Sequence, residues 1–453
     1  MEAIKKFQVS TEELSEKEKL VLEKLVHACE LIAPLYGKQK NSKFEGANFY
    51  PSDVKKEEIE EAAKKNPLLL HPYTFVEKDR RGRLIAVPFC VKFKKELGEI
   101  ARTLEEAARI SEDRNFSQYL REMARTLLRN DYAQNEILWI TRGHFKFSFI
   151  IGPVERYLDK LFFKKCAYQA WVGIVDEKRT EEAERFKKII LASRRKILPD
   201  TTKIELPKLR LEINKTVCFA GQKADFMTIG TNLPNDVALM EKNGSKLSIF
   251  SSSLTYNFKE RDYPIFRSVF NKKLQTYFSE GELQLALLRT VLLHEISHSL
   301  IRYRDAEQRL KELFPIFDEL LAYLLGIKCC GLLILKDALK QKELEAIISV
   351  FLLLNFQYWL DTKTDSVRMQ YAIGGAICQN FFSREGGLKE RNNVCFPDFT
   401  KLFISIDHLS HIIEHYLGSA SYEEAQKIIE EYGSFEIFEK CASGLKTLPK
   451  SKG

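Results

Sequence analysis

The segment LQLALLRTVLLHEISHSLIRY (residues 283–303) contains the pattern His-Glu-Ile-Ser-His within an apolar stretch of strong helical character. At about 100° per residue, His294 and His298 lie one turn apart on one face of a helix, where two imidazoles can share one ion. Glu295 is rotated about 100° from His294, which suits a base that acts on metal-activated water. Because the flanking residues are apolar, we expect a buried helix whose His and Glu side chains need partners.

An accidental match is the alternative to a metal site. With 8 histidines and 63 acidic residues in 453, such a pattern arises by chance at most about 0.02 times in this chain. A catalytic zinc also needs a third protein ligand and one open position. In KELFPIFDELLAYLLGI (311–327), Glu319 follows His298 by 21 residues, enough for a turn and a return along an antiparallel helix that starts near Pro315.

Two further groups of polar residues have competing interpretations. Asp318 either accepts the free ring N–H of a ligand histidine or is an ordinary solvated acid. His408, His411 and His415 share one helical stripe, but no acid stands in the position of Glu295. We therefore interpret these three histidines as helix surface or interface.

The bulk composition limits the class of protein. A chain of 453 residues with 45% hydrophobic content is long enough for two lobes with a cleft between them. The net charge of +8 comes from 71 basic and 63 acidic residues scattered along the chain, so we expect no nucleic-acid partner. Nine cysteines without CxxC spacing, and an N-terminus without signal or transit character, predict a cytoplasmic protein with free thiols.

Two apolar runs, 320–335 and 346–360, test for a membrane protein. Both are shorter than the roughly 18 to 20 apolar residues that a span needs, and the first contains Lys328. Buried helices, and no membrane partner, are the expectation.

The residue pattern changes twice along the chain, from helical periodicity to strand-like runs and back. Residues 11–35, 53–65 and 98–130 have helical periodicity, which returns from about 280 onward. Between 134 and 255, β-branched or aromatic runs predict several strands in one curved sheet or barrel, with an amphipathic helix at 177–197 as a crossing between lobes. These runs are ILWI (137–140), HFKFSFIIG (144–152), AWVGIVD (170–176), IELPKLRLEI (204–213) and KLSIFSSSL (246–254).

Four separated motifs resemble the dipeptidyl peptidase III family of zinc metallopeptidases, particularly its bacterial members with a five-residue HEISH-type motif. They are GPVERYLDKLFFKKCAYQAWVGI (152–174), GTNLPND (230–236) with Gly-Ser-Lys at 244–246, HEISH (294–298) and DELLA (318–322). The resemblance covers roughly residues 140–435. It implies an α+β, predominantly helical fold of two lobes around a cleft.

The resemblance also implies boundaries. Residues 1–175 and 208–256, with part of the C-terminus, would form a lobe with a β-barrel-like core. Residues 176–207 and 257–400 would form the helical zinc-binding lobe, and 401–453 would be C-terminal helices.

The resemblance assigns roles to further residues. Glu155, Asn232 and Asn235 match those that hold the free amine and the backbone of an oligopeptide substrate, and their chemistry suits an ammonium and amides. Tyr157 matches a tyrosine that stabilises an oxyanion; its alternative is a core tyrosine at the start of a strand.

The sequence departs from the family at three places. Tyr371 stands where the family has a histidine that steadies the transition state; tyrosine can donate a hydrogen bond but cannot supply a cation. Tyr323 replaces a carboxylate that supports a zinc histidine, so we expect weaker metal retention. Relatives continue beyond 445–449, so we expect part of the cleft floor to be missing.

These observations predict a zinc-dependent exopeptidase that releases dipeptides from the N-terminus of oligopeptides. One Zn²⁺ per chain would be held by His294, His298 and Glu319, with Glu295 as general base. The first alternative is a catalytically weak peptide-binding protein on the same scaffold, marked by the two substituted tyrosines. The second is a membrane-embedded protease, which partitioning into membranes would favour.

Overall fold

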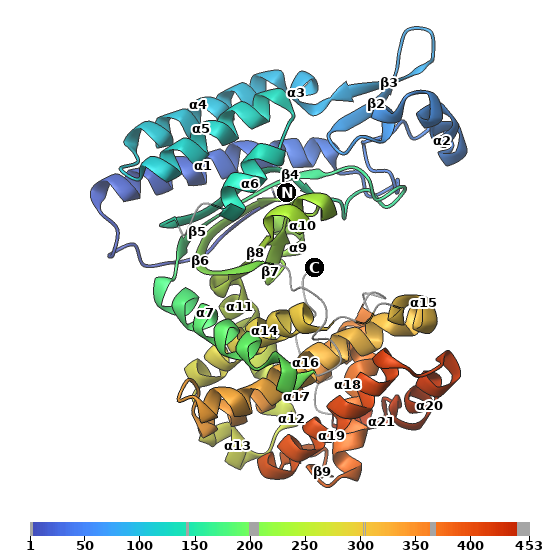
Figure 1. Ribbon diagram of the computed structural model, residues 1–453. Helices are drawn as coiled ribbons and strands as arrows, with labels where there is room; N and C mark the ends of the chain where they lie inside the picture. Colours follow the sequence, from blue (N-terminus) through green and yellow to red (C-terminus); the bar gives the residue numbers. More distant parts are fainter. Residues whose placement is uncertain are drawn as a thin grey trace. The chain divides into compact units, whose positions relative to one another are not determined.

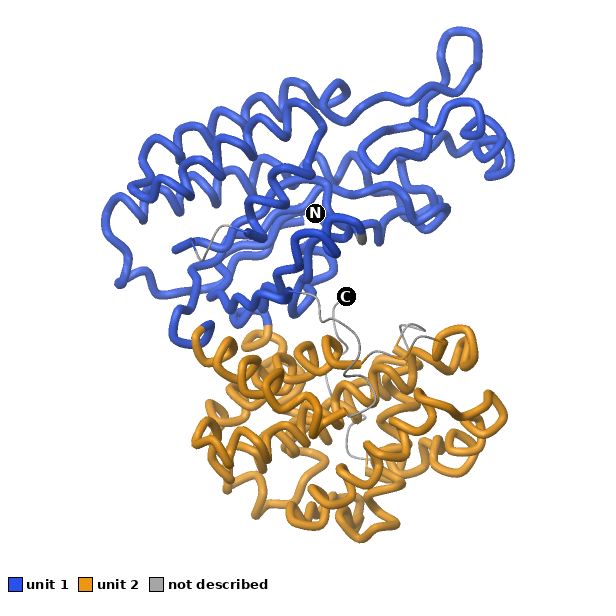
Figure 2. Tube along the Cα trace, viewed as in Figure 1, with its two compact units in different colours: residues 1–180, 207–253 blue, residues 181–206, 254–453 orange. Residues whose placement is uncertain are grey.

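The computed structural model describes residues 3–141, 145–198, 208–301, 303, 305–362 and 368–441. The chain forms two compact units (Figure 2): residues 1–180 with 207–253, and residues 181–206 with 254–453. The boundaries expected from the sequence are at 175, 207 and 256. The expectation about the end of the chain after 441 lies outside the described residues.

Unit 1 is built on the curved sheet that the sequence predicts. Its strands lie in the order β4-β5-β6-β8-β7, and β1 also pairs with β6. The β6–β8 pair is parallel, with Leu209 opposite Ser245, and the other pairs are antiparallel. The strands are β1 (Ile4–Lys6), β4 (Phe147–Glu155), β5 (Ala167–Val175), β6 (Leu209–Gly221), β7 (Gly230–Leu233) and β8 (Ser245–Phe250).

A stack of helices covers this sheet (Figure 1). Helix α1 (Glu16–Gln39) packs on β5 and β6, α4 (Lys94–Ile110) packs on α1, and α5 (Arg114–Arg129) packs on α4. Ser15 caps α1, since its hydroxyl accepts a hydrogen bond from the Glu18 N–H while Glu18 binds the Ser15 N–H. Because helices cover the sheet, every residue of β5 is buried.

Unit 1 departs from the sequence-based expectation at several places, of which two are the largest. ILWI (137–140), expected as a strand, belongs to α6 (Ala133–Thr141), where Trp139 packs edge-on against Trp171 of β5. A four-residue apolar run is too short for periodicity to distinguish a strand from one helical turn. The first third also contains an unexpected hairpin, β2 (Thr74–Lys78) and β3 (Leu84–Pro88), closed by Asp79, which accepts from the Arg81 and Arg83 N–H groups.

The remaining helices of unit 1 are short. They are α2 (Lys56–Lys65), α3 (Phe89–Lys92), α9 (Gln222–Phe226) and α10 (Val237–Asn243). Helix α7 (Glu177–Ala192) and α11 (Ser251–Asn257) contain crossings between the units.

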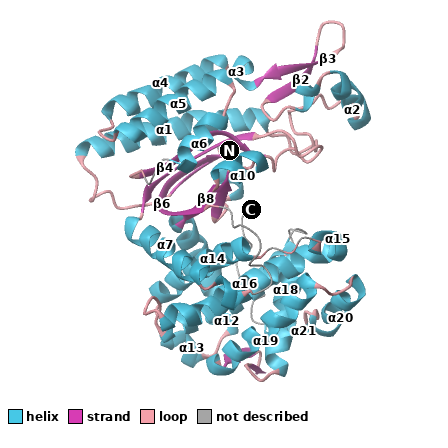
Figure 3. Ribbon diagram, in the orientation of Figure 1, coloured by secondary structure: helices cyan, strands magenta, loops and turns pink. Residues whose placement is uncertain are grey.

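Unit 2 is almost entirely helical (Figure 3). Its central helices are α14 (Glu280–Leu300), α16 (Phe314–Leu335), α17 (Gln341–Asp361), α18 (Met369–Arg384) and α19 (Phe399–Gly418). Smaller helices surround them: α12 (Tyr263–Val269), α13 (Lys272–Tyr277), α15 (Ala306–Leu310), α20 (Tyr422–Tyr432) and α21 (Glu436–Cys441). The C-terminal helices α19 to α21 thus belong to unit 2.

A small hairpin interrupts the helical C-terminal half. Strands β9 (Leu388–Arg391) and β10 (Val394–Pro397) pair antiparallel around Asn392 and Asn393, both with positive φ (53° and 62°). Asparagine tolerates this backbone conformation, which two-residue hairpin turns require. Helical periodicity in the flanking segments does not indicate this hairpin, and the Asn-Asn pair is its one local sequence signal.

Helix α17 is the one described helix that is long and apolar enough to cross a membrane by length and composition. Of its most apolar window, 78% is buried inside the protein.

The helix that carries His294 and His298 is anchored by a buried cation. Arg289 of α14, with 8% of its side chain exposed, binds Glu182 of α7 and Glu343 of α17, with an Nη1–Oε1 distance of 2.6 Å to Glu343. One guanidinium offers several donors in a fixed plane, so it can hold three helices together. This fork fixes α14 within unit 2.

We expect Arg289→Ala to destabilise unit 2 by about 3 kcal/mol, because it leaves Glu182 and Glu343 without their shared cation. Thermal unfolding of the metal-free protein measures this as a fall of roughly 6 to 12 °C. Lys342→Ala is the matched control, since Lys342 of α17 pairs with Glu282 of α14 but its side chain is 46% exposed. This substitution should lower the free energy of unfolding by less than about 1 kcal/mol. Equal effects of both substitutions would contradict the anchoring role.

Candidate functional site

The predicted site residues fall into two groups, one in each unit. The first lies on α14 and α16 of unit 2. A capping box of Ser279 and Glu282 begins α14, and Pro315 lies in the first turn of α16, where a missing N–H costs nothing.

The two helices approach closely where the site forms. A Cβ placed on Gly326 of α16 would lie 3.1 Å from the Leu293 carbonyl carbon and 3.3 Å from the His294 backbone nitrogen. These distances are tighter than ordinary contacts, so a Cβ at this position would require the two helices to move apart by a few tenths of an ångström. The approach brings Glu319, two turns earlier on α16, to the face that carries the histidines.

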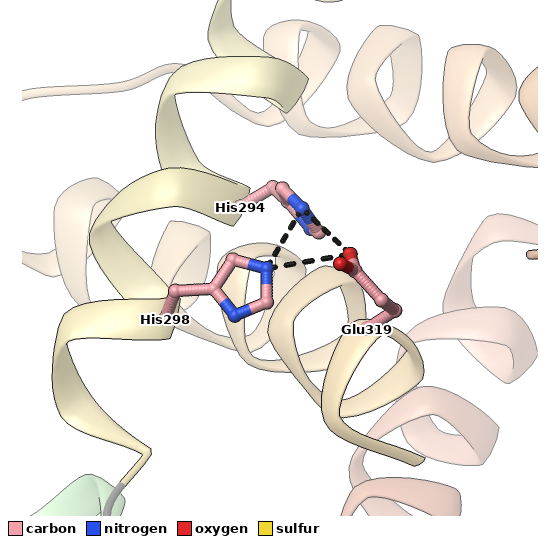
Figure 4. Close-up of side chains that lie close together, drawn as sticks. All are labelled: His294, His298 and Glu319. Carbon is pink, nitrogen blue, oxygen red and sulfur yellow. Dashed lines mark hydrogen bonds and ion pairs between the residues drawn. The ribbon is translucent and has the colours of Figure 1, made fainter. Parts of the chain in front are cut away.

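The three predicted ligand atoms converge (Figure 4). His294 Nε2 and His298 Nε2 are 3.0 Å apart, and Glu319 Oε2 lies 3.2 Å from the first and 3.3 Å from the second. Tetrahedral zinc ligands with bonds near 2.0 to 2.1 Å are about 3.3 Å from one another. The spacing of these donors therefore fits a zinc-sized cation, and in the described part of the chain this is the one such group of His, Cys, Asp or Glu.

The electrostatics of the group are those of two imidazoles around one carboxylate. Burial raises the pKa of Glu319, but hydrogen bonds from both histidines outweigh it and hold the pKa well below its usual range. Burial lowers the pKa of His298, but Asp318 and Glu319 outweigh it and raise the pKa to about 10. The site is thus strongly attractive to positive charge.

The two histidines have different supports. His298 Nδ1 lies 3.3 Å from Asp318 Oδ2, the contact expected for a carboxylate that orients a metal ligand. His294 Nδ1 is buried and has no hydrogen-bond partner among the described residues. Instead the Tyr323 ring packs against the His294 ring with centroids 4.0 Å apart, and the Tyr323 hydroxyl bonds the Tyr358 hydroxyl at 2.5 Å.

Tyr371 also joins this group. Its hydroxyl hydrogen-bonds Glu319, and its ring lies 4.9 Å from that of Tyr358. Burial and the Glu319 charge raise its pKa well above the usual range, so it stays a neutral donor. Tyr323, Tyr358, Tyr371 and Asn355 line a cavity that reaches Glu319.

Glu295 lies on α14 between the two histidines and is partly exposed. No other described residue forms a hydrogen bond or ion pair with its carboxylate. A carboxylate without such partners is available to act as a base.

The second group lies in unit 1. A register shift in the β4–β5 pairing between Pro153 and Glu155 marks a bulge, a feature that re-aims side chains. Asn235 Nδ2 donates to Glu155 Oε2 at 3.1 Å and to the Val154 carbonyl at 3.2 Å, and Tyr157 also hydrogen-bonds Glu155. Tyr157 is 47% exposed, so its alternative role as a core tyrosine is wrong.

Asn232 stands apart from this network. It is exposed on β7, opposite Leu247 of β8. Glu155 itself is 9% exposed, and burial raises the pKa of its carboxyl group above the usual value.

The rival histidines on α19 do not converge on one point. His411 lies between Asp407 and Glu414, His408 faces Glu385 at 3.8 Å, and His415 contacts Ser419. The side chains of His408 and His411 are more than half exposed.

Two solved structures share this architecture. A dipeptidyl peptidase III from Caldithrix abyssi matches with a TM-score of 0.87 at 22% identity, over 98% of this chain and 95% of that one. The chain has the dipeptidyl peptidase III fold. A second structure with this fold, dipeptidyl-peptidase III from Corallococcus sp. strain EGB, matches with a TM-score of 0.75 at 21% identity, over 98% and 93% of the two chains.

Comparison of sequences alone says less about the dipeptidyl peptidase III fold. No family model matches the chain. A curated relative, Nudix hydrolase 3 of Arabidopsis thaliana, is 22% identical over 371 residues, which are 78% of this chain. The chain spans about half the length of that relative (46%), so the activity in the name of the relative cannot be assigned to the matched half.

Sequence reasoning missed several residues of the site. In the sequence, Gly326 is one glycine in an apolar helix. Its contact with α14 arises from tertiary packing, so no local pattern indicates it. Tyr358 stands in the apolar run FQYWL (356–360), where a single hydroxyl could have signalled a buried polar contact. Lys223 of the Glu155 cavity had no sequence signal.

We expect Gly326→Ala to weaken Zn²⁺ binding by about 10-fold, because α16 must shift away from α14 and carry Glu319 with it. Competition with a chelator measures the affinity. Gly331→Ala on the same helix is the control, since its Cβ would meet only the movable Phe403 side chain, and its affinity should stay within about twofold. Unchanged affinity in Gly326→Ala would exclude the helix approach as the determinant of the site.

Proposed function

We propose that this protein is a zinc-dependent exopeptidase that releases dipeptides from the N-terminus of oligopeptides. The observation that carries the proposal is the convergence of His294, His298 and Glu319 on one point at ligand-to-ligand distances that suit zinc. The dipeptidyl peptidase III fold supports it. These three side chains would hold one Zn²⁺ per chain and leave a fourth position open.

In this proposal Glu295 is the general base. A bound Zn²⁺ supplies Lewis-acid polarisation of the scissile carbonyl and lowers the pKa of water in the open position. Glu295 removes the proton of the attacking water and returns it to the leaving amine. Asp318 keeps His298 in one tautomer by accepting its Nδ1–H.

Two tyrosines would act as neutral donors. Tyr157 would donate to the oxyanion, because its side chain is partly exposed and because burial and the Glu155 charge raise its pKa to about 12, which keeps it protonated. Tyr371 would donate to charge that develops near Glu319, which its hydroxyl already contacts.

Recognition of the substrate N-terminus would lie in unit 1. Glu155 offers a carboxylate to an ammonium, and Asn235, already bonded to it, fixes its orientation. Asn232, exposed on β7, would bind the peptide backbone. Anchoring the free amine sets the cut after the second residue.

The free thiols support a proposal for the cell compartment. All nine cysteines are free, and eight are buried, as suits a reducing compartment. We place the protein in the cytoplasm, with oligopeptides as its substrates.

A catalytically weak peptide-binding protein is the second candidate. The unpartnered His294 Nδ1 and the tyrosine contacts around it favour this alternative, because such a site retains its metal less firmly. Peptide binding by the zinc-loaded protein without release of dipeptides would support it.

We expect Glu295→Ala to retain zinc and lose about 10² to 10⁴ in hydrolysis of a dipeptidyl-naphthylamide, because a general base contributes that much. Glu319→Ala and His294→Ala should lose the metal as well. Metal analysis beside the activity assay separates the two effects. Full zinc occupancy in both ligand variants would refute the ligand assignment. Unchanged turnover in Glu295→Ala would show that Glu295 is not the general base.

We expect acetylation of the peptide amine to reduce kcat/KM by about 5- to 100-fold, since it removes a charge-assisted hydrogen bond and leaves the Glu155 carboxylate unpaired. Glu155→Ala should abolish most of this difference between free and blocked peptides. Product analysis by mass spectrometry provides the measurement. Equal cleavage of both peptides by the native protein, or cuts at internal bonds, would make it an endopeptidase.

A further inference from the structure

The Glu155 cavity contains a buried cation. Gly221, with φ of 62°, turns the chain from β6 into the short helix α9, and Lys223 on that helix is only 2% exposed. A Cβ at Gly221 would lie 2.3 Å from the Tyr168 carbonyl oxygen, so this turn requires glycine. The position of Lys223 is therefore fixed by the backbone.

Aromatic rings and hydroxyls surround the Lys223 ammonium. Its Nζ lies 4.4 Å from the ring centroid of Phe250 and 5.3 Å from that of Trp171. It also donates to the hydroxyls of Thr228 and Thr231. Ring faces and hydroxyls stabilise a cation without neutralising it.

Lys223 and Glu155 line one cavity. Gln169, 1% exposed, also lines it, and neither its amide nitrogen nor its amide oxygen has a hydrogen-bond partner among the described residues. Buried amides are normally satisfied, so an unpartnered one facing a cavity indicates a place for a polar ligand. Tyr157 and Phe226 complete the rim on its exposed side.

The other charged groups near α9 are already engaged. On α9 itself, Asp225 accepts hydrogen bonds from Tyr36 of α1 and from Lys40, the residue that follows α1. On β1, which packs against α9, Lys6 pairs with Glu30.

The strands around Lys223 contribute no further charge to it. β5 and β8 face it with Trp171 and Phe250, β6 with Phe219, and β7 with Thr231. On β4, Glu155 is the ionisable group whose charge acts on Lys223.

We propose that Lys223 is an internal rival of the substrate ammonium for Glu155, so that binding of a peptide amine expels the Lys223 proton. This inference rests on the proposed role of Glu155 in amine recognition. Two cations beside one buried carboxylate repel each other, and the buried lysine can relieve the repulsion by becoming neutral. Lys223 would thereby determine how strongly and at which pH the cavity accepts a free N-terminus.

The direction of the pH dependence follows from the same contacts. Burial lowers the pKa of Lys223 to about 7, against the opposing charge of Glu155. Below this pH Lys223 is charged in the free protein, so an incoming ammonium binds more weakly as the pH falls. Above about 8 the peptide amine loses its own charge. Amine recognition should therefore be strongest between about pH 7 and 8.

Calorimetry of peptide binding tests the inference without altering Lys223. The zinc-loaded Glu295→Ala protein is titrated at pH 6.5, in two buffers of different ionisation enthalpy, with a tetrapeptide and with its desamino analogue. We expect between about half and three quarters of a proton more to be released for the tetrapeptide than for the analogue, because Lys223 is about three-quarters protonated at this pH. No difference in proton release would overturn the inference.

Two substitutions of Lys223 in the same protein should have opposite effects. Lys223→Met removes the rival charge, so tetrapeptide affinity at pH 6.5 should rise by about fourfold, which is the cost of deprotonating a group with a pKa of about 7, and without the extra proton release. Lys223→Arg keeps a charge that cannot be lost, so affinity should fall and stay low up to pH 8. Melting temperatures identify any variant that fails to fold. In that case the proton release of the protein with Lys223 intact still tests the inference.

The outcomes separate this inference from the proposed function. If the Lys223-containing protein prefers the tetrapeptide but Lys223→Met binds it with unchanged or lower affinity, Lys223 is not a rival and amine recognition at Glu155 stands. If the tetrapeptide and its desamino analogue bind equally at every pH, amine recognition itself fails, and the inference fails with it.

Discussion

The close approach of α14 and α16 is the constraint on which the candidate metal centre depends. Gly326 lets α16 lie against the backbone of Leu293 and His294, and this places Glu319 level with both histidines. A one-residue change in register would rotate Glu319 by about 100° away from them. Arg289 holds the middle of α14 through Glu182 and Glu343, so the helix that carries the histidines is also fixed from a side other than α16.

Around this constraint the two histidines are oriented by different forces. Asp318 fixes both the plane and the tautomer of His298 through one hydrogen bond. The Tyr323 ring fixes only the plane of His294, because stacking does not select which ring nitrogen carries the proton. Tyr358 in turn holds Tyr323 through its hydroxyl, so the support of His294 extends to α17. The support of His294 is thus a neutral tyrosine network, whereas the support of His298 is a carboxylate.

The sequence predicted the parts of the molecule that depend on local pattern. The HEISH helix and the return helix with Glu319 follow from helical periodicity, and β4, β5, β8 and the start of β6 follow from β-branched and aromatic runs. The structure brings the three predicted ligand atoms together. Features that depend on contacts between distant segments could not be predicted. Gly326 has a role only because α14 passes beside it, and ILWI became a helix because Trp139 packs on Trp171 of the sheet. Pairing of Asn235 with Glu155, 80 residues away, could be expected only from the resemblance.

Among the described residues of unit 1, three lysines are buried, and their different partners explain why one of them can respond to a ligand. Lys246 forms an ion pair with Glu212, so its charge is neutralised within the fold. Lys165 is enclosed by the carbonyls of Leu69 and His71 and the Thr74 hydroxyl. Lys223 has rings, two hydroxyls and a cavity that it shares with Glu155, but no carboxylate in direct contact among the described residues. Its charge is therefore the least compensated of the three, and a second cation beside Glu155 offsets the one carboxylate charge that favours the protonated form of Lys223.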